Sequence, residues 1–386
     1  MPLDVIVLLY IALILVVAKI FGEIAERLKF SSMVGEVLAG VLLGPVIGIV
    51  RPDAFLEQIA GFGIIFLLFL IGLHTNFDSV RKDMYKASVL GIIAAGLSFA
   101  GGFLVGLWLL NDVNAGIFIG VILMSTSTAV GLRSLIDIGE IKTRVYEMTL
   151  AIDLADDVIA ILALSLLTSY FSLGAVQVWK VAALFFAVLG FIVVITTVGS
   201  KAVAKFLEIF KIMKDEQMLI AIPLVIVFVV SFLAEQVGIA GVTGAFLAGM
   251  AMNRSGLAES TIIPKVKTLG HGFFIPLFFA YSAIVFDLAV FRNSIHIVLI
   301  VLAIAALAKF IGAGYFSRVY RFNPRDQVLL GVGLIPRGEY AIVISQIALT
   351  AGIITSNIYT IMIAFVILSI IITPLLMRFA AKVKHF

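Results

Sequence analysis

Apolar residues fill long continuous stretches of the chain and do not form the narrow stripes of a surface helix. A helix needs about 20 mostly apolar residues to cross the hydrocarbon core of a bilayer. Thirteen stretches approach or reach that length, and only 239–253 is short. The pattern therefore predicts an all-α membrane protein with about thirteen transmembrane helices, at 3–23, 33–50, 56–74, 86–110, 115–135, 146–170, 179–200, 216–234, 239–253, 269–287, 294–316, 327–350 and 357–377.

The composition agrees with a membrane protein. Of the 386 residues, 62% are hydrophobic and 13% are charged, whereas a soluble domain carries about 25% charged residues. This excludes a soluble enzyme, a disordered chain and a nucleic-acid-binding protein. No cysteine, P-loop, Rossmann fingerprint or metal-spaced histidine pair occurs, so we expect neither a cofactor nor a nucleotide partner. Few residues remain between the stretches, so we expect one membrane domain over 1–386 and no soluble domain.

The basic residues are distributed unevenly between the predicted loops. Alternate loops and the C-terminal tail hold 22 of the 27 lysines and arginines, and the other loops hold only Arg51, Lys180 and Arg292. Because basic residues concentrate in cytoplasmic loops, the asymmetry places the N-terminus outside the cell membrane and the C-terminus in the cytoplasm. The remaining two, Lys309 and Arg337, fall inside predicted spans, where an ionisable residue indicates a functional site.

The chain partly repeats itself at a constant offset of 209 residues. Gly35 matches Gly244, Leu38–Gly40 matches Leu247–Gly249, and 25–80 shares twelve identities with 234–289 without a gap. The matching spans are seven helices apart, so the two copies cross the membrane in opposite directions. We therefore expect inverted repeats at about 1–170 and 216–386, joined by a helix at 179–200. Inverted repeats are typical of secondary transporters, whose sites lie near the midplane at discontinuous helices.

The same offset aligns two places where a helix is expected to break. Ser125–Thr128, within 115–135, is a run of four hydroxyl residues, which compete for main-chain hydrogen bonds. It aligns with Leu334–Arg337, within 327–350, where Pro336 removes a main-chain donor. Two interruptions at equivalent places predict a transport site. The alternative is that these residues only help the helices to pack.

Three aspartates lie within one predicted span, 146–170. Asp156 lies 12 residues after Arg144, which is about 18 Å along a helix and near the middle of a bilayer. Asp157 is its neighbour, and Asp153 lies about one turn earlier on the same side. Carboxylate oxygens suit hard cations, and a buried carboxylate holds either a proton or a cation. This competition would couple cation movement to proton movement; the alternative is a permanent buried ion pair.

Three further charged residues lie near these features. Lys309 needs a partner inside the hydrocarbon, and Asp156 or Asp157 is the obvious one. Structural pairing and a proton-carrying role both remain open for this lysine. Arg337 and Glu339 flank the break in 327–350, where we expect them to neutralise exposed helix ends.

Taken together, these residues resemble the sodium/proton antiporters of the monovalent cation:proton antiporter superfamily that carry an Asp-Asp motif. The resemblance covers nearly the whole chain. Its elements, in the expected order, are Gly35–Pro45, Leu67–Leu73, Ser127–Gly131, Asp156-Asp157, Lys309 and Pro336–Glu339.

The resemblance implies a fold with a core transport domain, a dimerisation domain, and two crossed discontinuous helices at 115–135 and 327–350. It implies that Asp157 binds the ion, that Asp156 pairs with Lys309, and that Thr128 lies at the first break beside Ser127. It also implies elevator-like alternating access. Asp153 departs from the family pattern, in which a small apolar residue is expected. The predicted ion or proton carriers are therefore Asp156, Asp157, Thr128, Ser127 and Asp153, with Na⁺ held by Asp157 and Asp156.

The predicted function is electrogenic exchange of Na⁺ or Li⁺ for protons by a homodimer in the cell membrane. The expected partners are monovalent cations, protons and the lipid bilayer, with no nucleic acid and no nucleotide. Three alternatives remain open: K⁺/H⁺ exchange by the same fold, sodium-coupled symport of an organic anion, and a non-transporting membrane sensor or scaffold.

Overall fold

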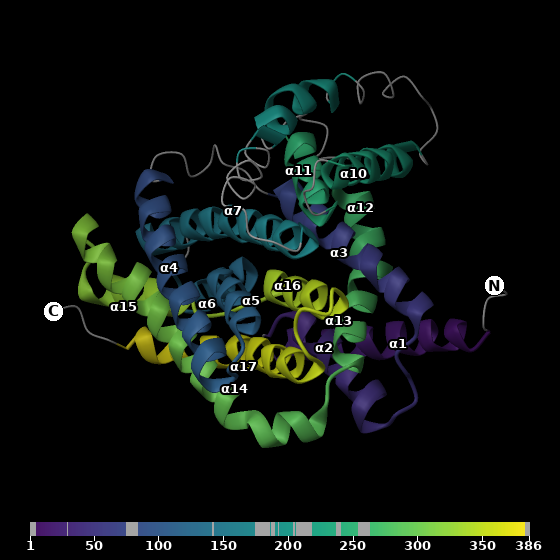
Figure 1. Cartoon of the computed structure of the whole chain (residues 1–386). Helices are drawn as coiled ribbons and strands as arrows, with labels where there is room; N and C mark the ends of the chain where they lie inside the picture. Colours follow the sequence, from purple (N-terminus) through teal and green to yellow (C-terminus); the bar gives the residue numbers. More distant parts are fainter. Residues whose placement is uncertain are drawn as a thin grey trace. The chain divides into compact units, whose positions relative to one another are not determined.

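The computed structural model describes residues 5–28, 30–74, 84–140, 143–173, 186, 190–191, 193–203, 205, 218–236, 241–253 and 263–382. All regular structure within these ranges is helical (Figure 1). The helices are α1 (Val5–Arg27), α2 (Ser32–Val41), α3 (Ala54–His74), α4 (Met84–Leu109), α5 (Val113–Met124), α6 (Thr128–Asp137), α7 (Arg144–Leu173), α10 (Met218–Gln236), α11 (Gly241–Asn253), α12 (Ile263–Leu269), α13 (Ile275–Ile284), α14 (Leu288–Lys309), α15 (Pro324–Gly333), α16 (Glu339–Thr350) and α17 (Ser356–Ala380).

Five of these helical segments are long and apolar enough to cross a membrane, and each coincides with a predicted span. They are Val5–Arg27, Ala54–Leu73, Tyr85–Leu109, Leu288–Tyr320 and Ser356–Ala380. Most of the other predicted spans are covered by shorter helices or by helices with interruptions, so the number of membrane crossings stays a prediction. Much of 179–200 lies outside the described residues.

Several predicted spans differ from the observed helices at their ends. The span predicted at 294–316 begins earlier, at Leu288, because the Asp287 side chain caps α14 by accepting hydrogen bonds from two main-chain N–H groups at 2.8 and 3.1 Å. Within 33–50, α2 passes into a π-helical turn at Leu42–Val46 that contains Pro45. The span 269–287 also contains a π-helical turn, at Gly270–Phe274.

The described chain divides into two compact units, of which the first contains 1–15, 53–76 and 161–278. In it, α3 and α11 pack closely at glycines. A Cβ atom at Gly72 would collide with the main chain of Phe246, and one at Gly249 would collide with that of Phe69. Small residues allow transmembrane helices to approach in this way.

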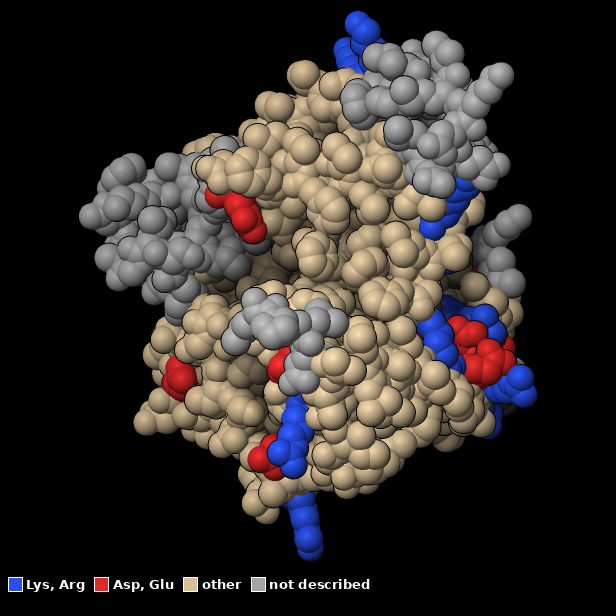
Figure 2. Space-filling view, turned by 90° about the vertical axis from the view of Figure 1, so that its right-hand side faces the viewer, with Lys and Arg blue, Asp and Glu red and all other residues tan. Residues whose placement is uncertain are grey.

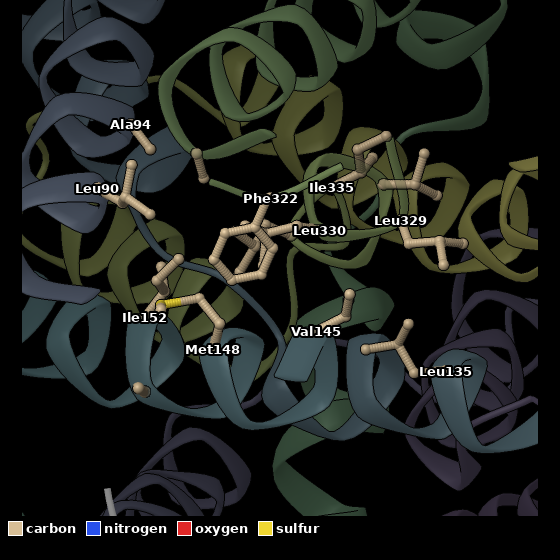
Figure 3. Close-up of a cluster of buried hydrophobic side chains, with 14 of the residues drawn as sticks. Leu90, Ala94, Leu135, Val145, Met148, Ile152, Phe322, Leu329, Leu330 and Ile335 are labelled. Carbon is tan, nitrogen blue, oxygen red and sulfur yellow. The ribbon is translucent and has the colours of Figure 1, made fainter. Parts of the chain in front are cut away.

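The second unit contains 16–52, 77–160 and 279–386. Its apolar core joins α4, α6, α7 and α15. Figure 3 shows Met148 and Ile152 of α7 directed toward Phe322 and Leu330, which lie just before and within α15. This packing holds the start of α7 against α15.

Two predicted cytoplasmic loops meet in this unit. Arg144 donates to the Tyr320 carbonyl oxygen at 2.7 Å, and its guanidinium lies 4.1 Å from the centre of the Phe322 ring. Arg325 and Glu140 form an ion pair at 2.7 Å. The loops after 115–135 and after 294–316 therefore lie on the same side, as the charge asymmetry requires. Which side of the membrane this is stays a prediction.

Helices at equivalent places follow the sequence offset of 209. Shifted by that number, α5 falls on α15, α6 on α16, and α7 on α17, each within a few residues at both ends. The local packing also corresponds. Gly35 abuts Phe21 in one copy and Gly244 abuts Val230 in the other, and each pair is one offset from its counterpart. The duplication itself and the inverted orientation of the two copies stay predictions.

Charged side chains are sparse on the face drawn in Figure 2. Small groups of Lys, Arg, Asp and Glu are separated by broad areas of other residues. Large apolar side chains are exposed on α10, among them Val225, Phe228 and Phe232. Such faces suit a lipid environment.

Candidate functional site

Both helices that were expected to break are interrupted at the predicted places. α5 ends at Met124, and α6 begins at Thr128 after an extended segment, with Ser127 as its N-cap. α15 ends at Gly333 and α16 begins at Glu339. The Ser127 N–H donates to the Pro336 carbonyl oxygen at 2.8 Å. The two breaks therefore contact each other in the second unit.

Gly338 shows how closely the breaks approach. A Cβ atom at this position would lie 2.5 Å from Ser127 Oγ and 2.7 Å from Ser127 Cβ. Any side chain there would push the two segments apart. The absence of a side chain at this position thus allows the second break to rest on the first.

Arg337 lies between the carboxyl ends of two helices. The side chain is fully buried. Its guanidinium donates to the Leu123 carbonyl oxygen at 2.8 and 3.1 Å, to that of Leu334 at 3.0 Å, and to that of Ile335. Leu123 belongs to the last turn of α5, and the other two follow the end of α15. A cation is favoured here because the last carbonyl groups of a helix have no partner within it.

Lys309 joins the end of α5 to an acid on α7. It is fully buried, and its ammonium donates to the Met124 carbonyl oxygen at 2.9 Å and pairs with Asp156 Oδ2. Thr126 Oγ donates to the same carboxylate oxygen at 2.8 Å. Asp156 is thus the partner of Lys309 among the two acids that the sequence offered.

Glu339 lies at the amino ends of two helices. It is the first residue of α16, and Ser127 Oγ donates to its Oε2 at 3.4 Å from the N-cap of α6. Anions are favoured at helix amino ends, where N–H groups are unpaired. Positive and negative side chains thus occupy the helix ends of opposite polarity.

The remaining predicted carriers differ in what the structure describes. Asp153 is 1% exposed, and neither of its oxygens has a hydrogen-bond partner in the described part of the chain. Asp157 lies in α7 and Thr128 begins α6, but their side chains fall outside the described residues. Among the side chains that are described, no three of His, Cys, Asp and Glu converge on a metal-sized site. The ion-binding roles therefore stay predictions.

A cavity of about 430 Å³ runs along α6 from near the break toward its far end. Val130, one turn after Ser127, lines it, as do Arg133 and Ser134. The other walls come from α1, the start of α2 and α17, through Glu26, Phe30, Ser31, Ser32, Ile370 and Pro374. Of these residues, Phe30 and Ser31 belong to the predicted cytoplasmic loop between the spans 3–23 and 33–50.

Sequence reasoning missed two contributors to this site. Thr126 was one of four adjacent hydroxyl residues, and nothing in the run distinguished the one that faces Asp156. Ser369 accepts a hydrogen bond from the Arg337 N–H at 3.0 Å, which secures the second break to α17. A lone serine in an apolar span gave no signal beyond its polarity.

Membrane-length helices, two touching helix breaks and buried charges between them are features of a secondary transporter. Residues 12–382 match the family described as "Sodium/hydrogen exchanger, transmembrane". The chain belongs to this family, and is thus a multi-pass membrane transporter and not an enzyme.

Relatives of known type span almost the same length as this chain. The chain is 28% identical over 378 residues to the Na(+)/H(+)-K(+) antiporter GerN of Bacillus cereus, and the aligned region covers 97% of this chain and 96% of that protein. It is 28% identical over 374 residues to the Na(+)/H(+) antiporter of Enterococcus hirae, covering 96% and 97% of the two chains. The solved structure of the sodium proton antiporter MjNhaP1 from Methanocaldococcus jannaschii at pH 8 matches with a TM-score of 0.73 at 18% identity, over 97% and 98% of the chains, which shows the shared fold.

Proposed function

We propose that this protein exchanges Na⁺ or Li⁺ for protons and moves net charge in each cycle. The observation that carries the proposal is the buried pair of Asp156 and Lys309, which lies against the end of a broken helix. A permanent structural pair would need no such position. Beside a helix break, a cation that competes for the carboxylates would release protons.

In the proposed mechanism, Asp157 binds the cation, and Asp156 releases its ion-pair partner Lys309 when the cation enters. Because Lys309 and Thr126 already occupy Oδ2 of Asp156, we assign the ion to the neighbouring carboxylate of Asp157. Ser127 and Thr128 at the first break would supply further oxygens. Arg337 and Glu339 compensate the charges of the helix ends, so that the break persists without the ion.

We further propose that the cation reaches the break through the cavity along α6, and that access alternates by an elevator-like movement of a core domain in a homodimer. Inverted repeats at about 1–170 and 216–386 would supply the two equivalent breaks, as transporter folds with such repeats do. The N-terminus would lie outside and the C-terminus in the cytoplasm.

Proteoliposome flux tests the proposal directly. Purified protein is reconstituted, and internal pH is followed while Na⁺, Li⁺ and K⁺ are offered separately to the outside without any organic solute. Proton movement with Na⁺ and Li⁺ but not K⁺ is expected. If none of the three cations causes proton movement, cation/proton antiport is excluded. The remaining alternatives would then be a symporter of an organic anion or a non-transporting sensor or scaffold.

K⁺/H⁺ exchange is the second candidate. It is favoured by the name of GerN, and by that of the K(+) efflux antiporter 4 of Arabidopsis thaliana, which is 25% identical over 379 residues and covers 96% of this chain and 64% of that protein. Larger K⁺ flux than Na⁺ flux in the same vesicles would establish it.

Competition for one carboxylate gives the exchange a defined pH dependence. Lowering the pH raises the fraction of carboxylate that holds a proton, so the Na⁺ concentration for half-maximal exchange should rise. For one competing proton, the rise approaches about tenfold per pH unit below the pKa of the site. Initial rates at several Na⁺ concentrations between about pH 6 and 8 measure this dependence. If the half-maximal Na⁺ concentration stays constant over a pH range in which the maximal rate changes, the proton and the cation do not share a site.

The pair of Lys309 and Asp156 predicts a dependence on membrane potential. If Na⁺ displaces Lys309 from Asp156, one proton leaves from the lysine and one from Asp157, against one Na⁺ carried. Wild-type exchange should therefore respond to a potential set with K⁺ and valinomycin. The double variant Lys309→Gln with Asp156→Asn should be a slower exchanger that no longer responds. Exchange that ignores the potential in the wild type would reduce Lys309 to a structural counter-charge.

A further inference from the structure

Asp153 is a buried acid that takes no part in the ion pair between Asp156 and Lys309. Its side chain is 1% exposed, and neither carboxyl oxygen has a partner among the described residues. Asp156, three residues later on α7, has the opposite surroundings, because two donors occupy its Oδ2. Two acids on the same side of one helix therefore differ in their hydrogen bonding, because Asp156 has two donors and Asp153 has none among the described residues.

Among the described residues, no cation forms an ion pair or a hydrogen bond with Asp153. In the described part of the chain, the charged groups that face it are Asp156 on its own helix, Lys309 on α14, and Arg337 and Glu339 at the second break. Lys309 already binds Asp156 and a main-chain oxygen, and Arg337 binds only main-chain oxygens. A buried carboxylate without donors is strongly disfavoured and takes up a proton instead. These surroundings favour the neutral form of the Asp153 carboxyl group over the charged form.

Thr149 extends the same polar track by one turn. It is fully buried, and its hydroxyl has no partner in the described part of the chain. It faces the end of α15, where a Cβ atom at Gly333 would lie 3.7 Å from Thr149 Oγ. Thr149, Asp153 and Asp156 recur at the spacing of four and three residues that places side chains on one side of a helix. The track is about 10 Å long and points toward Arg144, where α7 begins.

We propose that Asp153 and Thr149 form a proton relay along α7, which connects Asp156 with the Arg144 end of the helix. The relay rests on the proposed cation/proton exchange and supplies its proton route. When Na⁺ displaces Lys309, an N–H bond of the ammonium breaks, and its proton passes through a water molecule beside Asp156 to form a new O–H bond at one Asp153 oxygen. Water is needed because Asp153 and Thr149 make no hydrogen bond in the described structure. The O–H bond at the other Asp153 oxygen breaks, its proton reaches the Thr149 oxygen through a second water molecule, and Thr149 gives up its own hydroxyl proton to water at the Arg144 end of the helix. Asp153 is neutral before and after, so the step moves one proton and no other atom.

Proteoliposome exchange with Asp153→Asn and Thr149→Val tests the relay. Asparagine keeps the shape of aspartic acid but cannot pass on a proton in this way. The maximal rate at saturating Na⁺ should fall at least about tenfold, as expected when a proton-transfer group is lost. The half-saturating Na⁺ concentration should stay within about twofold, because binding and proton transfer are separate steps. Thr149→Val should slow exchange less, and Asp153→Glu should restore most of the rate.

Ser98→Ala provides the matched control. Ser98 is also fully buried with no partner among the described residues, but it lies on α4 and not on the track. It should exchange at the wild-type rate. Size-exclusion profiles and melting temperatures of all variants in detergent establish that they fold.

Two results would overturn the relay. One is a wild-type rate in Asp153→Asn, or in Thr149→Val if the first variant does not fold. The other is a higher half-saturating Na⁺ concentration at an unchanged maximal rate, which would make Asp153 a cation ligand instead. Wild-type vesicles without cation-driven proton movement would remove the proposed function itself, whereas a slow Asp153→Asn beside an active wild type supports the relay.

Discussion

Replacing Asp157 with asparagine is expected to reduce cation-driven proton movement to that of protein-free vesicles. The expectation follows from the division of labour on α7. One oxygen of Asp156 is held by Lys309 and Thr126, and we therefore proposed that its neighbour Asp157 receives the ion. Asparagine has nearly the same shape but carries no charge and cannot exchange a proton. Internal pH, followed after a Na⁺ pulse, measures the loss.

Glu147→Gln is the control for this variant. It removes a carboxylate from the first turn of the same helix, where the side chain is exposed. Its flux should match the wild type. Normal flux in Asp157→Asn, with a monodisperse protein, would show that another group carries the ion.

Replacing Arg337 with methionine is expected to cause the largest loss of stability of any single change at the breaks. Methionine approximates the length of the side chain but donates no hydrogen bond. The carbonyl groups of Leu123, Leu334 and Ile335 would lose their buried donor. At about 1–3 kcal/mol for each unsatisfied group, the free energy of unfolding should fall by at least about 3 kcal/mol.

Thermal unfolding in detergent compares this variant with Arg133→Met. Arg133 is an exposed arginine in α6 that pairs with Asp137 at 3.2 Å, and its removal should change stability by less than about 0.5 kcal/mol. Arg337→Lys should fall between the two, because one ammonium cannot donate to both helix ends in the way that a planar guanidinium does. A wild-type melting temperature for Arg337→Met would contradict the bridging role.

The breaks were predictable because they depend on local chemistry. A run of hydroxyl residues and a proline between apolar flanks disrupt a helix wherever they occur, and the offset of 209 showed that both lie at equivalent places. The contact between the breaks was not predictable in detail. It depends on Gly338 approaching Ser127 across more than 200 residues of sequence.

The ends of helices were harder to predict than their apolar centres. Hydropathy placed the start of one span at 294, because Arg292 and Asn293 are polar, whereas α14 begins at Leu288. The missed signal was Asp287, whose side chain caps the helix. Partner choice was open for a different reason. From the residues alone, Lys309 could pair with either of two adjacent acids, and only the family resemblance implied Asp156. The hydrogen bond of Lys309 to the end of α5 places its ammonium at Asp156.

The two equivalent glycine contacts have an evolutionary consequence. Gly35 meets the main chain of Phe21, and Gly244 meets that of Val230, so no neighbouring side chain can move aside to admit a methyl group at either place. After a duplication, each copy would inherit this steric constraint separately. Most of the aligned residues in 25–80 and 234–289 differ between the two segments. Glycines required by main-chain contacts would then stay identical in the two halves, so that a common origin could still be detected after the surface residues have changed.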